Sequence, residues 1–407
     1  MTQTEKTVPQ RVIVVGAGPV GLVAAASLAR EGIPVTILEK SRDLPKDLRA
    51  STFHSPTMDM LEPFGVMPGL IEKGLVCQHW QFRDREEGVI ATYDLGLLEG
   101  ATNYPFRLQC EQWKLTEALR DILEASESTE LLYNLRATGV TQDDDGVTLT
   151  VQHDDGTVEE MKAAYVIACD GAHSALRKAL DVPFEGMTIP EIFLSMSTTF
   201  DFGAAIPDLT PIAYLTDPQE WAVLLRTPSL WRVLLPTDPG MTEEQIKDPA
   251  LMEKRLQALC PKEGPYDVVH ATAYRVHQRV AKSYVAGRVF LAGDSAHLNN
   301  PLGGMGMNGG VHDAVNLVEK LGKIWRGEAG LELMQLYDAQ RRKACIDTVQ
   351  SQSIRNRRMM AETDPEARKA YHAELREVVA DPEKHRAFVM RSSMIQSLRD
   401  VEALEEA

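Results

Sequence analysis

Residues 11–39 read RVIVVGAGPVGLVAAASLAREGIPVTILE, and this stretch decides the fold. Residues 11–15 are a short β-branched run without polar alternation, which is typical of a buried parallel strand. Residues 16–21 predict a turn, residues 22–30 an alanine-rich helix, and residues 35–38 a second strand. The N-terminal region therefore contains a complete βαβ unit.

Three glycines in this turn have the spacing that a dinucleotide requires. Gly16 permits the tight turn, Gly18 lets the backbone approach a pyrophosphate, and Gly21 lets helix and strand pack closely. The second strand ends at an acid, where ribose hydroxyls bind. The unit predicts dinucleotide binding without distinguishing FAD from NAD, and the alternative is a glycine-rich turn without a ligand. The predicted contacts here are Gly16, Gly18, Val20, Gly21, Glu39 and Lys40.

Composition excludes several classes of protein. The chain has 407 residues, 44% apolar and 25% charged, which is ordinary for a globular protein with two or three domains. Its formal net charge of −16 argues against nucleic acid as a partner, because phosphate contacts need a basic surface. An anionic substrate such as a carboxylate or a phenolate would therefore need a local positive charge.

Cysteine usage and hydropathy indicate a cytoplasmic protein. The five cysteines are odd in number and scattered without a CxxC pair, so we expect neither a disulfide framework nor a metal site. The N-terminal MTQTEKTVPQ has no signal-peptide architecture. Residues 12–29 are nearly all apolar, but three glycines and a proline in their middle fit a strand, turn and helix better than a membrane span.

The residue pattern changes in the middle of the chain. From about residue 182 to residue 279 prolines are dense, and short β-rich runs appear at residues 221–225 and 231–235. We predict a second, largely antiparallel sheet domain inserted into the first. The C-terminal 70 or so residues are charged and helical, with Asp-Pro-Glu helix starts at 364–366 and 381–383. We expect these helices to pack on the first domain or to form a dimer contact.

A second glycine motif separates the possible cofactors. Residues 293–310 read GDSAHLNNPLGGMGMNGG and follow a predicted strand, and a helix is predicted from Gly309 through Leu321. An acid at a strand end can hold a ribityl hydroxyl, and the glycines bring backbone amides close to a flat polar ring. The next helix points its N-terminus at that ring, where its dipole stabilises negative charge on a reduced flavin.

With these motifs, the sequence resembles the FAD-dependent aromatic monooxygenases of the p-hydroxybenzoate hydroxylase fold, and most closely their phenolic-acid and polyketide hydroxylases. Residues 293–317 are similar to the second flavin motif of that family almost end to end. Residues 169–178, CDGAHSALRK, resemble its Asp-Gly motif, which is associated with FAD and the nicotinamide donor. The resemblance covers roughly residues 10–320.

The resemblance implies an α/β fold, in which a discontinuous Rossmann-like FAD-binding domain carries an inserted, mostly antiparallel substrate domain and C-terminal helices. The FAD-binding domain would comprise residues 1–75, 105–182 and 283–335, and the substrate domain residues 76–104 and 183–282. Residues 336–407 would form the helical segment.

The resemblance also implies roles for single residues. Arg49 would reach the FAD phosphates, Gln112 the flavin, and Asp294 the ribityl or pyrophosphate region, while Val140 would lie near the adenine. Further predicted FAD contacts are Asp170, Gly304, Gly306, Met307 and Asn308, the last two through backbone groups at the isoalloxazine edge.

Pro301 would lie over the flavin face near the reacting oxygen, and is predicted as catalytic with Tyr214 and Arg226. Arg232, Tyr104 and Arg107 are further candidates for the substrate pocket, each of which could instead be structural. His297 and His54 have the look of catalytic bases, but a structural role is favoured for both.

The implied activity is hydroxylation of a phenolic or N-heteroaromatic substrate. NADH or NADPH would reduce the flavin, and dioxygen would form a C4a-hydroperoxide that transfers OH to the ring. The chain would act as a monomer or homodimer. The alternatives are a flavin NAD(P)H oxidase, a redox-gated flavin-binding protein and a geranylgeranyl-type reductase; a halogenase is disfavoured because no WxW signature occurs.

Overall fold

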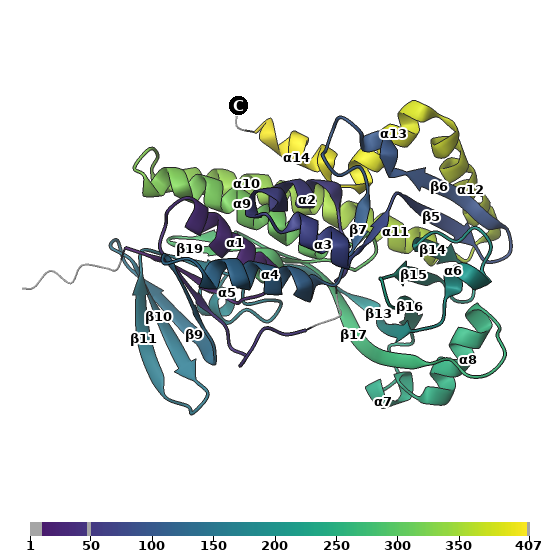
Figure 1. Ribbon diagram of the computed structural model, residues 1–407, viewed down its shortest axis with the longest axis horizontal. Helices are drawn as coiled ribbons and strands as arrows, with labels where there is room; N and C mark the ends of the chain where they lie inside the picture. Colours follow the sequence, from purple (N-terminus) through teal and green to yellow (C-terminus); the bar gives the residue numbers. More distant parts are fainter. Residues whose placement is uncertain (1–9, 47–49, 405–407) are drawn as a thin grey trace, which may run out of the picture.

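The structure, a computed structural model, describes residues 10–46 and 50–404. One part of the molecule is organised around a six-stranded sheet with the order β18-β19-β12-β1-β2-β8, parallel except for β18 (Figure 1). These strands are β1 (Val12–Val15), β2 (Val35–Leu38), β8 (Thr129–Leu132), β12 (Tyr165–Ala168), β18 (Val285–Ala286) and β19 (Val289–Leu291). The predicted βαβ unit is therefore confirmed. Every residue of β1 and β2 is buried, as expected for a parallel sheet covered on both faces.

Helices and a small sheet pack against these strands. The helix α1 (Pro19–Arg30) packs against both α4 (Gln112–Glu124) and α9 (Gly306–Trp325). An antiparallel sheet of β9 (Leu135–Gln142), β10 (Val147–His153) and β11 (Val158–Ala163) adds its apolar side chains to the same core. In Figure 1 this small sheet lies on the opposite side of the parallel sheet from α9.

The second large sheet has eight strands in the order β20-β17-β13-β16-β15-β14-β5-β6. All its neighbours are antiparallel except β14 and β5, so the predicted mostly antiparallel character is confirmed. The two long strands β13 and β17 pair from Phe184 opposite Ala281 to Thr198 opposite Val268. They lead from the parallel sheet into the second sheet and back (Figure 1). The strands are β5 (His79–Asp84), β6 (Gly88–Asp94), β13 (Phe184–Thr198), β14 (Ile212–Thr216), β15 (Ala222–Arg226), β16 (Trp231–Thr237), β17 (Val268–Ala281) and β20 (His297–Leu298).

A third sheet of three short strands lies between the two large ones in the order β3-β7-β4. Its strands are β3 (Thr52–Phe53), β4 (Leu75–Cys77) and β7 (Arg107–Gln109). The remaining elements before the C-terminal segment are α2 (Ser55–Leu61), η1 (Glu62–Phe64), α3 (Met67–Lys73), η2 (Leu95–Leu98), α5 (Ala175–Ala179), α6 (Phe202–Ala205), α7 (Glu243–Ile246), α8 (Pro249–Leu259) and η3 (Gly293–Ser295).

The C-terminal segment is helical, as predicted. It contains η4 (Leu331–Leu333), α10 (Met334–Lys343), the π-helix η5 (Ala344–Gln350), α11 (Ser351–Met360), α12 (Pro365–Ala380), α13 (Pro382–Ser392) and α14 (Ile395–Glu402). The two Asp-Pro starts are confirmed: Asp364 accepts a hydrogen bond from the N–H of Ala367 at 2.8 Å, and Asp381 accepts one from that of Glu383 at 2.9 Å.

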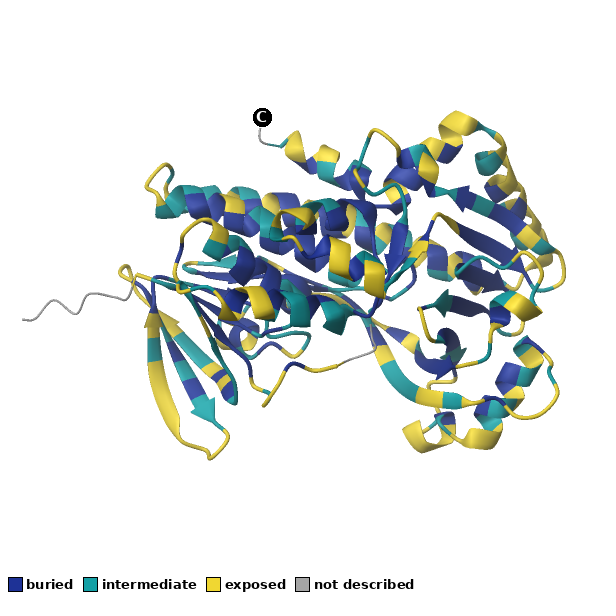
Figure 2. Ribbon diagram, in the orientation of Figure 1, coloured by how far each residue is buried: buried dark blue, intermediate teal, exposed yellow. Residues whose placement is uncertain are grey.

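The position of this segment corrects one expectation. Its first part, η4, α10 and η5, packs on α9 beside the parallel sheet. By contrast, α11 packs on β14, and both α12 and α13 pack on β6. Figure 2 shows the buried faces of these helices turned toward the larger sheet. The expected packing on the first domain therefore holds for the first part of the segment. It does not hold for α11–α13, because apolar side chains such as Met360, Leu375 and Phe388 join the core of the larger sheet.

Two helices also begin earlier than predicted. The helix α1 starts at Pro19, so Gly21 lies in its first turn, and α9 starts at Gly306, so Met307 and Asn308 are helical. Proline tolerates the first helical position because it has no N–H to lose there. Among the described residues, the structure has no helix with the length and apolar character needed to span a bilayer.

Candidate active site

The first glycine loop has one open position and two crowded ones. Gly16 has φ +104°, and a Cβ there would lie 2.4 Å from the carbonyl oxygen of Cys169. A Cβ on Gly21 would lie 1.9 Å from the carbonyl oxygen of Gly16. A Cβ on Gly18 would meet nothing within 4 Å. Two glycines therefore allow strands and helix to pack, while the third leaves free space at the helix N-terminus.

That N-terminus has the features of an anion site. Gly18 is the N-cap of α1 and supplies no side-chain hydrogen bond to the first turn. Glu39 is buried beside it and accepts hydrogen bonds from the backbone N–H groups of Ala17 and Ser41, both at 2.9 Å. Lys40 follows and is exposed. The sequence thus places free N–H donors and one carboxylate at the same end of the parallel sheet.

The two glycine motifs meet in space at Val20. A Cβ on Gly293 would lie 2.9 Å from Val20 Cγ2, and a Cβ on Gly310 would lie 2.5 Å from the same atom. The side chain of Val20, predicted as a cofactor contact, therefore packs α1 against the second motif. This contact brings together segments more than 270 residues apart in the chain.

A buried ionic cluster fixes the second motif. Asp313 in α9 accepts a hydrogen bond from Gly293 N–H at 3.0 Å, and its carboxylate lies 2.7 Å from both His297 and Arg341. Burial opposes the charge on His297, but Cys345 and Asp313 raise its pKa well above the ordinary value. His297 therefore serves as a structural cation, in agreement with the role that was favoured for it.

The loop before α9 is held by one amide side chain. Asn308 is fully buried; its Oδ1 accepts from His54 N–H at 2.9 Å, and its Nδ2 donates to the carbonyl oxygens of Thr52 at 2.8 Å and Gly304 at 2.6 Å. Gly303 and Gly304 have φ of +119° and +66°, so L side chains would strain this loop. The Asn308 side chain was not predicted to act, yet it ties the loop to β3.

A small enclosed cavity lies between this loop and the larger sheet. Its volume is about 60 Å³. The lining residues come from the loop, from β7 and from the sheet, and include Pro301, Gly304, Tyr214, Arg107 and Arg232. This is where a substrate pocket between sheet and flavin ring was expected, and it brings together two of the three predicted catalytic residues.

Buried polar side chains line this cavity or hold the loop beside it. Tyr214 is 4% exposed, and its hydroxyl accepts a hydrogen bond from Gly303 N–H at 3.0 Å. Burial raises the pKa of Tyr214, and the guanidinium of Arg107 acts in the opposite direction. Burial and Arg107 both hold the pKa of His54 well below its ordinary value, so His54 is neutral and bonds Gly303 O at 2.9 Å.

The prediction that Arg226 belongs to the catalytic site needs a correction. Its guanidinium lies 3.7 Å from Asp201 and 5.8 Å from the centroid of the Trp231 ring, and it is absent from the residues that line the cavity. Along β15 the side chains alternate between faces, and Val223 and Leu225 face the cavity while Arg226 does not. The structure therefore places Arg226 outside the candidate site, against the prediction.

The other predicted contacts are dispersed around the glycine loops. Asp170 accepts from Ala175 N–H at 2.7 Å and caps α5, while Asp294 is exposed in η3. Gln112 begins α4, with its N–H bonded to Ala50 O at 3.0 Å, and Val140 is half-buried in β9. Tyr104 is half-buried and does not line the cavity. Arg49 lies outside the described residues.

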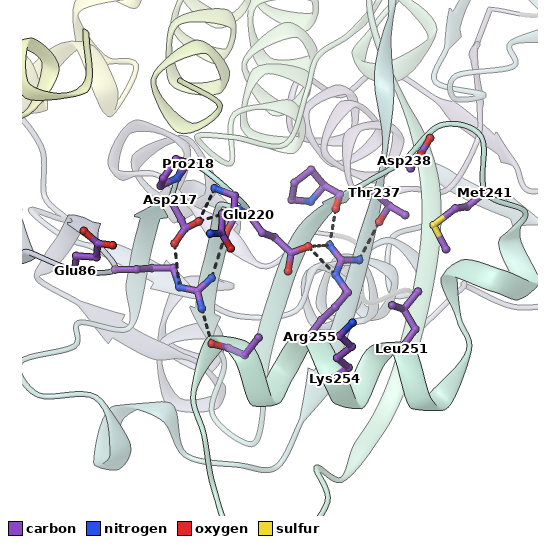
Figure 3. Close-up of a pocket in the computed structure, with 14 residues that line it drawn as sticks. Glu86, Asp217, Pro218, Glu220, Thr237, Asp238, Met241, Leu251, Lys254 and Arg255 are labelled. Carbon is purple, nitrogen blue, oxygen red and sulfur yellow. Dashed lines mark hydrogen bonds and ion pairs between the residues drawn. The ribbon is translucent and has the colours of Figure 1, made fainter. Parts of the chain in front are cut away.

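A larger hollow elsewhere has a different character. It measures about 720 Å³ and lies beside α8, far along the larger sheet from the glycine loops (Figures 1 and 3). Its arginines are already paired: Arg85 lies 3.5 Å from Asp217, and Arg255 lies 2.8 Å from Glu220. Figure 3 shows Arg255 directed at Glu220 among the lining residues, so the volume of the hollow alone does not make it the reaction site.

These features fit a flavin dinucleotide. The open side of Gly18 and the uncapped start of α1 suit a pyrophosphate, and the Pro301–Gly304 loop ahead of α9 suits a ring system next to the cavity. The fold and the site thus define a flavoprotein with a small cavity between the Pro301–Gly304 loop and the larger sheet.

Comparison with known proteins also identifies the chain as a flavin-binding protein. Residues 10–352 match the family model described as FAD binding domain, and the chain belongs to this family. It is 32% identical over 395 residues to the para-nitrophenol 4-monooxygenase of Pseudomonas sp. (strain WBC-3), covering 96% of this chain and 97% of that one. It is 31% identical to a 6-hydroxy-3-succinoylpyridine 3-monooxygenase of Pseudomonas putida (strain DSM 28022 / S16), covering 88% and 90%.

Solved structures show the same architecture. A crystal structure of p-nitrophenol 4-monooxygenase from Pseudomonas putida DLL-E4 matches with a TM-score of 0.90 at 30% identity, over 95% of this chain and 98% of that one. A complex of aklavinone-11 hydroxylase with FAD and aklavinone matches with 0.75 at 25% identity, over 89% and 70%. The predicted membership is confirmed: the protein is an FAD-dependent aromatic hydroxylase that uses NAD(P)H and dioxygen. The similarity extends beyond residue 320 into the C-terminal helices, further than expected.

Proposed function

We propose that this enzyme hydroxylates a single-ring phenol held between the Pro301–Gly304 loop and the larger sheet. The observation that carries the proposal is the enclosed cavity of about 60 Å³ at that place. A cavity of roughly 150 Å³ accommodates benzene, so even a single ring would require the lining side chains to move apart, and fused rings would require a larger movement. Both bacterial relatives named above act, by name, on compounds with one aromatic ring.

FAD, when bound, supplies the electron transfer from NAD(P)H and the activation of dioxygen. Gly16, Gly18 and Gly21 would cradle its pyrophosphate with the α1 N-terminus, and Glu39 would bind a ribose. The N-terminus of α9, with Met307 and the Asn308 backbone, would face the isoalloxazine ring. The remaining predicted contacts, Val140, Gln112, Asp170, Asp294 and Gly306, stay proposals of the same kind, as do Lys40 and Arg49.

The protein's own residues would position the ring and exclude water. Pro301 and Tyr214 lie on facing walls of the cavity, one on the glycine loop and one on β14. The Tyr214 hydroxyl already accepts one hydrogen bond from the loop, and it can donate to a phenol oxygen. A dry cavity matters because water there would divert the activated oxygen to hydrogen peroxide.

The same proposal includes the division of the chain. Residues 1–75, 105–182 and 283–335 would bind FAD, and residues 76–104 and 183–282 would bind the substrate. The strands of the parallel sheet fall in the first set and most strands of the eight-stranded sheet in the second, which supports this division. A monomer or homodimer in the cytoplasm would fit the five free cysteines.

The test is a coupling measurement on the FAD-loaded enzyme. Single-ring phenols are titrated while NADH or NADPH oxidation, oxygen uptake and peroxide release are followed. The proposal expects phenol-stimulated turnover with little peroxide and a hydroxylated product. Peroxide formation in stoichiometric amounts with every phenol would instead identify an NAD(P)H oxidase.

A further inference from the structure

Arginines are the charged side chains among the described residues that line the cavity. Its lining residues are Thr52, Arg107, Ser195, Ile212, Tyr214, Val223, Leu225, Arg232, Leu234, Tyr274, Pro301, Leu302, Gly303 and Gly304. Two of them are arginines, and no aspartate or glutamate is among these described residues. This is notable in a chain with a net charge of −16, where an anionic substrate needs a local attraction.

Arg107 is the more deeply placed of the two arginines. It lies on β7 and is 2% exposed, with its guanidinium 4.8 Å from the centroid of the Trp80 ring. One Nη donates to the carbonyl oxygen of Ser392 at 3.2 Å, and Nε is buried without a hydrogen-bond partner. Within residues 10–46 and 50–404 no carboxylate pairs with it.

Such a guanidinium is expensive to bury. A charged group moved out of water costs several kcal/mol unless an opposite charge compensates it, and a ring face and one carbonyl oxygen compensate only part. Burial accordingly lowers the pKa of Arg107, yet an arginine remains protonated in proteins. An anion in the cavity would supply the missing partner and would meet a preformed donor.

We propose that the substrate binds with an oxyanion on its aromatic ring, a phenolate or a carboxylate, paired with the Arg107 guanidinium. This inference rests on the proposed function, because it places the aromatic substrate in this cavity. Arg107 selects the ionised form of the substrate over neutral rings of the same size. A phenolate held in this way is also richer in electrons, which favours attack by an electrophilic oxygen.

The first experiment uses wild-type enzyme loaded with FAD and no NAD(P)H. The probe is 4-nitrophenol, whose phenolate form absorbs visible light, added at a pH below its own pKa in water. The expected result is the phenolate band on binding, together with release of a proton to the buffer. Binding of 4-nitroanisole, which cannot ionise, should be roughly 10- to 100-fold weaker, the value of one charge-assisted contact. A bound probe that stays neutral, or equal affinity for the anisole, overturns the inference.

Benzoate and benzyl alcohol distinguish the two oxyanions. Tight binding of 4-nitrophenolate with weak binding of benzoate assigns the site to phenolates, and the reverse assigns it to carboxylates. Both results require a preference for the anion over its neutral counterpart. The neutral counterpart is 4-nitroanisole for a phenolate site and benzyl alcohol for a carboxylate site, and equal affinity within the relevant pair counts against the pairing with Arg107.

Variants connect the preference to the residue. Arg107→Met should remove the phenolate band and the preference for anions, while Arg107→Lys should retain part of both because it keeps the charge. Arg83→Met is the matched control, since Arg83 on β5 is also buried but donates to the carbonyl oxygens of Pro207 and Asp208 and does not line the cavity. An Arg107→Met enzyme that still ionises the probe overturns the inference.

The inference and the proposed function can fail separately. Turnover of neutral and ionised phenols at equal efficiency would refute the role of Arg107 and leave the hydroxylase intact. Arg107-dependent binding of phenolates, followed only by peroxide release with NAD(P)H, would uphold the pairing and refute hydroxylation of these compounds.

Discussion

Replacing Gly18 by alanine should separate FAD binding from folding. In the structure the new Cβ would meet no atom within 4 Å, and Gly18 has φ −72° and ψ 177°, which alanine adopts without strain. Alanine is a poorer N-cap than glycine, but it also restricts the unfolded chain, and the two effects are each below about 1 kcal/mol and opposite in sign. We expect the free energy of unfolding of the apoprotein to change by less than about 0.5 kcal/mol.

The same Gly18→Ala substitution should weaken the binding of FAD. The free space beside Gly18 is where the pyrophosphate approaches the backbone, so a methyl group there should weaken FAD binding at least tenfold, or about 1.4 kcal/mol. Urea unfolding followed by circular dichroism gives the stability, and titration of flavin fluorescence gives the dissociation constant. A Gly18→Ala protein that binds FAD as tightly as the wild type would refute the assignment of this space.

Gly21→Ala is the matched comparison within the same loop. Its Cβ would lie 1.9 Å from the Gly16 carbonyl oxygen, which is backbone and cannot rotate away. The helix α1 would have to move by more than 1 Å relative to β1, at a cost of about 1–3 kcal/mol in the apoprotein itself. Equal stability of Gly21→Ala and wild type would contradict the close packing described here.

Three further predictions concern buried polar groups. Asp313→Asn should lower the free energy of unfolding by about 3–5 kcal/mol in urea titrations, because it leaves His297 and Arg341 as buried cations without their counterion. A loss below about 1 kcal/mol would argue against the cluster. Burial lowers the pKa of His312 from 6.5 to about 3, so the unfolded chain binds a proton that the folded protein lacks, and stability should fall as the pH falls through this range. By pH 5 the loss from His312 should reach about 2 kcal/mol, and a His312→Asn variant should show a flatter acid limb in the same titration. Tyr214→Phe should lower the free energy of unfolding by about 1–3 kcal/mol, because the buried N–H of Gly303 loses its acceptor. The variant should also raise the peroxide released per NAD(P)H oxidised, and an unchanged peroxide yield would remove Tyr214 from the proposed site.

Local patterns in the sequence were sufficient for the elements around the cofactor. The β-branched run ahead of Gly16 predicted β1, the Asp-Pro pairs predicted the starts of α12 and α13, and the glycine-rich segment after residue 293 predicted a loop that leads into a helix. Each of these signals acts within a few residues, through propensity or capping. The start of α9 was placed three residues late because the glycines before it look like loop until packing holds them in helical geometry.

Long-range placement was harder to predict. Arg107 and Arg226 both look like substrate contacts in the sequence, and only the pairing of β15 with β14 and β16 shows that Arg226 faces Asp201 instead. The Asn308 side chain and the Asp313 cluster were missed because they depend on distant partners, such as Thr52, 256 residues from Asn308, and Arg341, 28 residues from Asp313. The polar residues at 308 and 313 inside an apolar helix were the available signal, since buried polar side chains require partners.

The residues that complete the cavity wall lie near the C-terminus, so they are synthesised last. The glycine loops are complete by residue 310, but the carbonyl that meets Arg107 belongs to Ser392, and the amide that bonds Leu302 belongs to Asn356. Arg341, which pairs with Asp313 beside the second glycine loop, also precedes those residues, so the parts of the FAD cradle are synthesised before the helices that close the cavity. Without those last fifty residues, a flavin reduced by NAD(P)H would meet dioxygen in a site open to water, which favours peroxide over product.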